Sequence, residues 1–380
     1  MAVHALEAAL RPHFIEREPV IHLLLVSLVA RQHVVLLGPA GTGKTRLAKA
    51  FGTITGLHTW AKLVSSGTTP DEIFGGIKVD SLATGQYERN AAHRLPEAQI
   101  AILDEIFKSS DFLAGSYLDI MEERCWENGG HLVPAPLEML IGLSNEMPDA
   151  DGKASAALWD RFAFRYVVSY IRDLPLWQAW LTDVATPGYQ PPVLPVWLPP
   201  EELAALRAAA AQVDVRPTLS LLAQVRTALA EDGLVVSDRR WALAVSAVRA
   251  EAALAGRSTA TGTDLRILEH LLWEQPDDHP VVRHALYTIV APLDLDALTL
   301  EDKAREEMAL ITAAENDGKR LLQAADGSMN LAKLIKSAER LLHEAQGQGT
   351  ATDTIDQVLA HLRASYTQVM TLFQQPAKGG

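Results

Sequence analysis

The chain has 380 residues, of which 48% are hydrophobic and 21% are charged, a balance typical of a globular protein with room for two or three domains. The formal net charge of -13 argues against broad nucleic-acid binding, which depends on lysine and arginine side chains that meet phosphate. The single cysteine, Cys125, excludes an internal disulfide framework. The sequence does not open on a basic, apolar leader, and the longest apolar stretch, residues 20–30, is too short to cross a bilayer. We therefore expect a cytoplasmic protein.

Strands alternate with helices in the first half of the chain. Strands are expected at four short, mainly apolar runs, residues 34–37, 58–64, 99–105 and 137–145. Helices are expected at residues 7–30, 69–74 and 111–123. Thr69 can cap the second of these, because Pro70 suits the first helical position. The alternation predicts a parallel sheet flanked by helices.

Two β-hairpins are expected to interrupt this alternation. Within residues 75–96, apolar residues alternate with polar ones ahead of a turn at residues 83–85. A second hairpin is expected around Asn128-Gly129, a pair typical of tight turns.

The second half of the chain reads as helical. The proline-rich residues 186–200 cannot form a helix or an inner strand and predict a linker after a core at residues 1–185. Helical periodicity follows at four places, residues 203–211, 219–230, 239–255 and 262–273, which gives a helical domain at 201–280. In residues 281–380, two strong apolar faces predict a helical hairpin.

A glycine-rich stretch between the first strand and a helix predicts a phosphate-binding loop. It fits the pattern G-x-x-x-x-G-K-[ST] with Gly38, Pro39, Ala40, Gly41, Thr42, Gly43, Lys44 and Thr45. The glycines let successive N–H groups point at phosphate oxygens, and Lys44 supplies a point charge to the β- and γ-phosphates. The Thr45 hydroxyl is a hard oxygen ligand for Mg²⁺. A chance match in an ordinary turn is the alternative.

Polar side chains at the ends of two later strands point to hydrolysis. Asp104 would complete the Mg²⁺ shell, and Glu105 would accept a proton from an attacking water or orient it. Asn145 could orient the water or touch the γ-phosphate. The alternatives are a strand that exits into solvent at Asp104 and Glu105, and a turn that favours asparagine at Asn145.

Four motifs in order resemble those of AAA+ ATPases. They are the phosphate loop, "ILDEI" at residues 102–106, "GLSNEMP" at 142–148 and "LWDRFAFR" at 158–165. Within that superfamily the chain resembles the MoxR branch, and "TTPDEIFGG", "LPEAQIAILDEIFKSS" and "VSDRRW" look most like the RavA subgroup. The resemblance covers about residues 5 to 275 and implies an α/β P-loop core followed by an α-helical lid.

The resemblance also implies roles for three residues. Asn145 falls at the sensor 1 position. Arg161 falls where the family places an arginine finger that reaches the ATP of a neighbouring subunit, although Arg165 is a rival and Arg161 could instead pair with Asp160. Arg239 falls at sensor 2 on the lid, with Arg240 as its rival.

The implied function is a ring-forming, ATP- and Mg²⁺-dependent ATPase, with a hexamer as the usual assembly, that remodels a protein partner. A separate protein with a von Willebrand factor A (VWA) domain would accompany it. The two hairpins match family inserts, and Tyr87 and Trp126 either grip a substrate or pack within their own hairpins. A nucleic-acid motor or loader is the main alternative, although the acidic charge opposes it. A small-molecule kinase and a slow ATP-gated scaffold are further alternatives. The C-terminal helices either dock a partner or pack against the chain's own lid.

Overall fold

A computed structural model describes residues 2–82, 85–148, 153–188, 194–195, 198–314 and 317–373. The chain forms two compact units. The first unit contains Met1–Leu219 and Val235–His279, and the second contains Ser220–Leu234 and Pro280–Gly380. The segment Ser220–Leu234 therefore groups with the C-terminal residues, whereas the sequence places it in the helical domain at 201–280. Seven of the fifteen residues expected as a linker, 189–193 and 196–197, lie outside the described residues.

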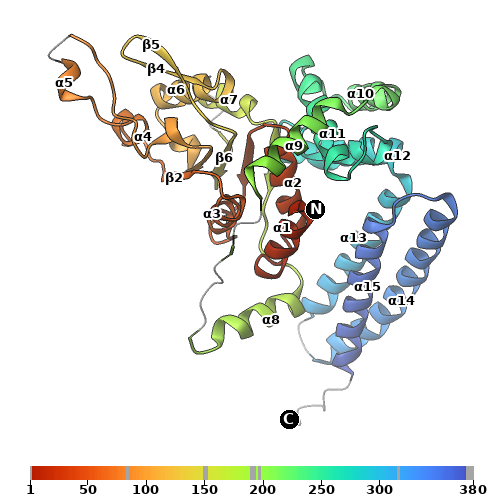
Figure 1. Cartoon of the computed structure of the whole chain (residues 1–380). Coiled ribbons are helices and arrows are strands. Elements are labelled where there is room, and N and C mark those ends of the chain that lie inside the picture. Colours follow the sequence, from red (N-terminus) through yellow and green to blue (C-terminus); the bar gives the residue numbers. More distant parts are fainter. Residues whose placement is uncertain are drawn as a thin grey trace. The chain divides into compact units, whose positions relative to one another are not determined.

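The first unit is built on a five-stranded sheet with the order β2-β3-β6-β1-β7 (Figure 1). Its strands are β1 (Val34–Leu37), β2 (Thr59–Leu63), β3 (Ile100–Asp104), β6 (Met139–Ser144) and β7 (Phe164–Val167). Every neighbouring pair in this sheet runs parallel. The predicted parallel α/β fold is confirmed, and the phosphate-loop strand β1 lies between β6 and β7.

Burial follows from the position of each strand. The central strands β1 and β6 are buried along their whole length, as expected for a parallel sheet covered on both faces. The edge strand β2 is only partly buried. Because the strands are parallel and in register, their carboxyl ends meet at one edge of the sheet, where ligands of open α/β sheets bind.

Helices flank this sheet and complete the first unit (Figure 1). The α-helices are α1 (Ala2–Leu10), α2 (Glu18–Val29), α3 (Lys44–Thr55), α4 (Pro70–Phe74), α5 (Val79–Leu82), α6 (Asp111–Glu122), α7 (Lys153–Arg161), α8 (Leu174–Ala185), α9 (Pro200–Gln212) and α11 (Asp238–Leu254). The 3-10 turns are Arg11–His13, Leu95–Glu97, Ile106–Lys108, Arg216–Thr218, Gly262–His270 and Pro276–Asp278. The expected α-helix at 262–273 is thus a 3-10 segment that ends at His270. Thr69 caps α4 as predicted, in a capping box with Glu72.

The two expected hairpins differ in outcome. Strands β4 (Cys125–Asn128) and β5 (His131–Pro134) pair antiparallel as predicted. Among the described residues of the earlier segment, Ile77 and Arg89 form one isolated antiparallel bridge, flanked by backbone hydrogen bonds from Lys78 to Glu88 and from Asn90 to Gly76. The chain then turns into the short helix α5 instead of continuing the strand. Val79 is 78% exposed, so the apolar residue of the alternating pattern packs against no core. A strand at this position would therefore gain little stability from side-chain packing. Two residues of the predicted turn, at 83 and 84, lie outside the described residues.

The second unit is helical. It contains α10 (Leu219–Glu231), α12 (His279–Val290), α13 (Pro292–Thr312), α14 (Asp317–Gln348) and α15 (Asp353–Leu372) (Figure 1). A core of small and aliphatic residues joins the last three helices into a bundle: Ala297, Ala304, Ile311, Ala324, Leu331, Ala338, Ala345, Ile355, Val358, Leu359, Leu362 and Val369. The predicted pair of helices is therefore part of a three-helix bundle. No helix in the described parts of the chain is long and apolar enough to cross a membrane.

Candidate functional site

The glycine-rich loop connects β1 to α3 at the carboxyl edge of the sheet. Gly38 has a φ of 140°, and a Cβ built on it would lie 2.1 Å from the backbone oxygen of Val168. Gly43 precedes α3 with a φ of 85°. Only glycine accommodates such a close approach in this conformation. All eight residues of the predicted phosphate loop therefore lie in one strand-loop-helix unit, and the loop's backbone shape depends on its glycines.

Lys44 reaches back across the loop. Its Nζ atom donates to the backbone oxygens of Gly38 (2.6 Å) and Pro39 (3.0 Å), and to Oδ1 of Asn145 (3.0 Å). Burial lowers the pKa of Lys44, while the carboxylates of Asp104 and Glu105 act to raise it. The ammonium group is thus held at the mouth of the loop, among acceptors that a phosphate oxygen could replace.

A threonine and a carboxylate from adjacent elements form a pair of hard oxygen donors. The hydroxyl of Thr45 donates to Oδ2 of Asp104 over 2.8 Å. Among the described residues, no group of three or more His, Cys, Asp and Glu side chains gathers as a metal site. A hydroxyl and one carboxylate nevertheless fit Mg²⁺, which keeps several waters and takes its other ligands from phosphates.

Glu105 occupies a strained position beside this pair. Its φ is 56°, a left-handed conformation that costs a residue with a Cβ about 1–2 kcal/mol. Asn145 Nδ2 donates to its Oε1, while its buried Oε2 accepts no hydrogen bond from the described residues and lies 3.3 Å from Nζ of Lys108. The structure therefore brings Lys44, Asn145 and Glu105 into one hydrogen-bonded chain.

Two residues that the sequence analysis missed also touch the loop. The buried side chain of Arg17 donates to the backbone oxygens of Ser169 (2.6 Å) and Thr42 (3.3 Å). The hydroxyl of Tyr170 donates to the backbone oxygen of Ala40 over 3.0 Å. These contacts join residues far apart in sequence, so no local motif could have revealed them.

The four candidate arginines fall into two groups. Arg165 and Arg240 are fully buried and share Glu274, each at 2.9 Å. Burial lowers the pKa of both, and Arg165 reaches about 9. Both also donate to several backbone oxygens, among them those of Trp273 and Leu271. These two guanidinium groups hold the core of the first unit together.

The other two arginines lie together at the surface. Arg161 contacts Glu122 at 2.6 Å and Asp160 at 3.6 Å, and Arg239 contacts the same acids at 3.5 Å and 3.2 Å. Their side chains are 21% and 39% exposed. Phe164, three residues after Arg161, pairs with Val34, the first residue of β1.

This register places the surface arginines away from their own phosphate loop. The loop follows the opposite end of β1, and a strand of four residues spans about 13 Å. Arg161 and Arg239 therefore lie near the amino edge of the sheet, whereas Lys44, Asp104 and Asn145 lie at its carboxyl edge.

Comparison with known families identifies the family of the chain. Residues 2–190 match the profile described as the MoxR domain in MoxR-vWA-beta-propeller ternary systems, and residues 217–286 match an AAA lid domain. The chain belongs to the MoxR family of AAA+ ATPases. The RavA subgroup does not emerge from these matches.

Several relatives of this MoxR-family chain are known. The uncharacterised proteins MJ0812 and MJ0079 of Methanocaldococcus jannaschii are 33% identical over 74% of both chains and 29% identical over 92% of both chains, respectively. Chaperone MoxR1 of Mycobacterium tuberculosis is 26% identical over 44% of this chain and 45% of its own length. A crystal structure of an ATPase candidate from Cytophaga hutchinsonii has a TM-score of 0.60 at 17% identity, over 76% of this chain and 93% of that one. That likeness supports the P-loop NTPase fold.

Proposed function

We propose that this MoxR-family chain hydrolyses ATP in a ring, most simply a hexamer, and uses the energy to remodel a protein partner. One observation carries the proposal. The partly exposed pair Arg161 and Arg239 lies at the edge of the sheet away from the chain's own phosphate loop. Such a pair is suited to a nucleotide held by an adjacent copy of the chain.

The residues of the phosphate loop would bind the nucleotide. Backbone N–H groups of the loop and the amino end of α3 would bind the phosphates, and Lys44 would contact the β- and γ-phosphates. Thr45 and Asp104 would hold Mg²⁺, whose charge neutralises that of the phosphates. Arg17 and Tyr170 would stabilise the conformation of the loop, because they donate hydrogen bonds to the backbone oxygens of Thr42 and Ala40.

Hydrolysis would depend on Glu105 and Asn145. The buried Oε2 of Glu105 is paired with Nζ of Lys108 at 3.3 Å but accepts no hydrogen bond from the described residues, and it is suited to take a proton from an attacking water. Asn145 accepts a hydrogen bond from Lys44 and donates one to Glu105, and it would thereby position the Glu105 carboxylate relative to the γ-phosphate. This arrangement gives the strained backbone of Glu105 a function.

The finger would come from the neighbouring copy. Arg161 and Arg239 now share Glu122 and Asp160, and a triphosphate brought to them would compete for both guanidinium groups. A cation donated in trans makes hydrolysis depend on assembly. In this proposal the sensor 2 arginine and the finger serve one and the same nucleotide.

The partner would be a VWA-domain protein in the cytoplasm. The matching profile describes MoxR domains of systems that also contain vWA and beta-propeller components, which favours a protein over a nucleic acid as the client. The likeness of three stretches to the RavA subgroup agrees with the same general role. Stimulation of the ATPase by DNA, and not by a VWA-domain protein, would favour the motor or loader alternative.

Complementation between two inactive variants tests the shared site. Glu105→Gln keeps the finger and Arg161→Ala keeps the catalytic glutamate, so each alone should be nearly inactive. In an equimolar mixture, hydrolysis should recover to roughly a quarter of the wild-type rate, because half of the intact glutamate sites then face an intact finger. A mixture no more active than its components would overturn the trans arrangement, and an Arg161→Ala variant with normal activity would remove Arg161 from it.

A further inference from the structure

The outward face of α14 in the second unit carries an unusual arrangement of side chains. Successive residues of a helix are rotated by about 100° around its axis. Leu331, Ala338 and Ala345 are buried in the three-helix bundle. On the opposite side, within about 40° of one line, lie Leu322, Met329, Lys333, Lys336 and Arg340, which we call the α14 face. The exposed acids Asp326 and Glu344 lie at the border of this face.

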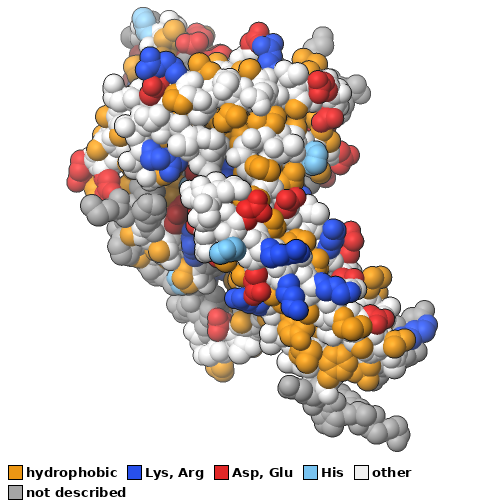
Figure 2. All heavy atoms as spheres, turned by 90° about the vertical axis from the view of Figure 1, so that its right-hand side faces the viewer, with side chains coloured by type: hydrophobic (Ala, Val, Ile, Leu, Met, Phe, Trp, Pro, Cys, Tyr) orange, Lys and Arg blue, Asp and Glu red, His pale blue; other side chains and the backbone are white. Residues whose placement is uncertain are grey.

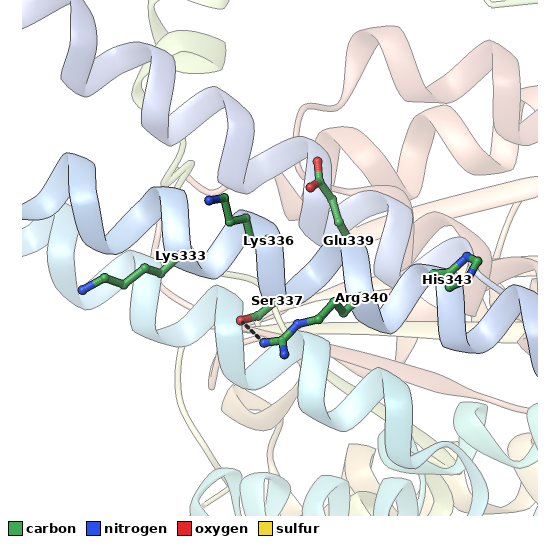
Figure 3. A pocket seen from close by; sticks show the side chains of 6 residues that line it. All are labelled: Lys333, Lys336, Ser337, Glu339, Arg340 and His343. Atoms are coloured by element: carbon green, nitrogen blue, oxygen red, sulfur yellow. Dashed lines mark hydrogen bonds between the residues drawn. The ribbon is translucent and has the colours of Figure 1, made fainter.

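The carboxyl-terminal half of the α14 face is basic. Lys333, Lys336 and Arg340 are exposed and border a shallow depression together with Ser337, Glu339 and His343 (Figure 3). Arg340 donates to the hydroxyl of Ser337 over 3.3 Å, and none of the three cations forms an ion pair with a described carboxylate. The one acid at the depression, Glu339, is itself paired with Arg363 of α15 at 2.8 Å.

The amino-terminal half of the α14 face is apolar. Leu322 is 68% exposed and Met329 is 59% exposed, although both are large hydrophobic side chains. Figure 2 shows hydrophobic side chains below a group of lysine and arginine side chains on the face that it presents. Exposed anchors beside unpaired cations are typical of a protein-binding surface, in which apolar contacts give affinity and charges set orientation.

We propose that the α14 face binds an acidic amphipathic helix of a partner protein. The partner helix would place two apolar side chains on Leu322 and Met329, and carboxylates opposite Lys333, Lys336 and Arg340. A nucleic acid would leave the apolar half unused, and three cations neutralise few phosphates in a chain of net charge -13. The face lies outside both family matches, which cover residues 2–190 and 217–286, and the proposal does not depend on the nucleotide site.

A peptide-binding experiment on the full chain tests this. The probe is a fluorescent synthetic helix of about 20 residues with glutamates and leucines on one side, which matches the roughly 27 Å from Leu322 to Arg340. We expect micromolar binding to the wild type. The triple variant Lys333→Glu, Lys336→Glu, Arg340→Glu should raise Kd at least about tenfold, or about 1.4 kcal/mol. The double variant Leu322→Ser, Met329→Ser should weaken binding by a similar factor.

Matched controls keep the result specific. The variant Lys49→Glu, Arg94→Glu, Lys303→Glu makes the same charge change at exposed lysines and arginines elsewhere and should leave Kd unchanged. If the triple glutamate variant has an altered circular dichroism spectrum, its fold is perturbed. The binding measurement is then repeated with the milder variant Lys333→Gln, Lys336→Gln, Arg340→Gln. The proposal is overturned if the wild type does not bind the probe, if a sequence-scrambled peptide binds equally well, or if the control variant loses as much affinity. Tighter binding of a 20-nucleotide DNA or of phosphatidylglycerol vesicles, lost in the same α14 variant, would also overturn it and assign the face to that ligand.

Discussion

Gly38 offers a quantitative test of how the phosphate loop is built. In Gly38→Ala, the new Cβ would lie 2.1 Å from the backbone oxygen of Val168, far inside normal contact distance. Neither backbone can retreat easily, because the N–H of Val168 donates to the oxygen of Leu37 over 2.7 Å. Overpacking of this kind costs about 1–3 kcal/mol. The φ of 140° adds about 1–2 kcal/mol for a residue with a Cβ.

The matched control lies three residues along the same loop. Gly41 also has a positive φ, 85°, but a Cβ on it would meet no atom within 4 Å. Gly41→Ala should therefore cost only the conformational part, about 1–2 kcal/mol. In thermal unfolding without nucleotide, followed by circular dichroism, we expect Gly38→Ala to lower Tm by about 5–15 °C, clearly more than Gly41→Ala. Equal shifts for the two variants would show that the contact with Val168 does not constrain the loop.

Three other predictions concern the first unit. Lys44→Ala should abolish binding of a fluorescent ATP analogue, because it removes the cation at the loop; unchanged affinity would contradict the phosphate site. Glu105→Gln should bind that analogue as tightly as the wild type but hydrolyse ATP about 100-fold more slowly or worse, and normal phosphate release would exclude Glu105 as the base. His22 lies between Glu7 (2.7 Å) and Glu251 (2.8 Å). Burial alone would lower its pKa, but these two carboxylates outweigh it and raise the pKa to about 10. Because the folded-state pKa is raised, this stabilisation should be complete below about pH 6.5 and disappear as the pH rises towards 10. In His22→Gln the free energy of unfolding should depend less on pH between about 6.5 and 10. An unaltered pH dependence would contradict the ion pairs of His22 with Glu7 and Glu251.

Much of the fold was accessible from sequence because its signals are local. Four short runs predicted the strands β1, β2, β3 and β6, and the strand-loop-helix pattern around Lys44 predicted the phosphate loop. The order of the strands in the sheet depends on contacts between distant residues, so no local pattern specifies it. The strand β7 also lacked a clear local pattern and was not predicted. Its four residues, Phe164–Val167, lie in a short apolar stretch that the charged Arg165 interrupts.

The residues of the candidate site also differ in whether a local sequence signal could reveal them. Thr45, Asp104 and Asn145 could be named because each ends or begins an element whose type the sequence reveals. Arg17 and Tyr170 could not, since their contacts with the loop cross long sequence separations. Burial separates the partly exposed Arg161 from the fully buried Arg165, and only the packed structure contains that information.

Likewise, the third helix of the C-terminal bundle had a weak sequence signal. In α13 the buried hydrophobic residues are Ala297, Ala304 and Ile311, seven residues apart and mostly small, and the buried positions Asp294 and Glu301 are acidic. Its other residues include many acids, so its apolar face is narrow. The wide apolar faces of α14 and α15 were predicted, whereas the helix that covers them was not.

In the proposed assembly the nucleotide is bound between two copies of the chain. The most direct test of this arrangement is ATP turnover per subunit, measured with saturating Mg·ATP across a dilution series, with the mass of the particles measured in the same samples. We expect turnover to fall together with the fraction of assembled rings as the protein is diluted. A monomer that turns over ATP at the undiluted rate would contradict it.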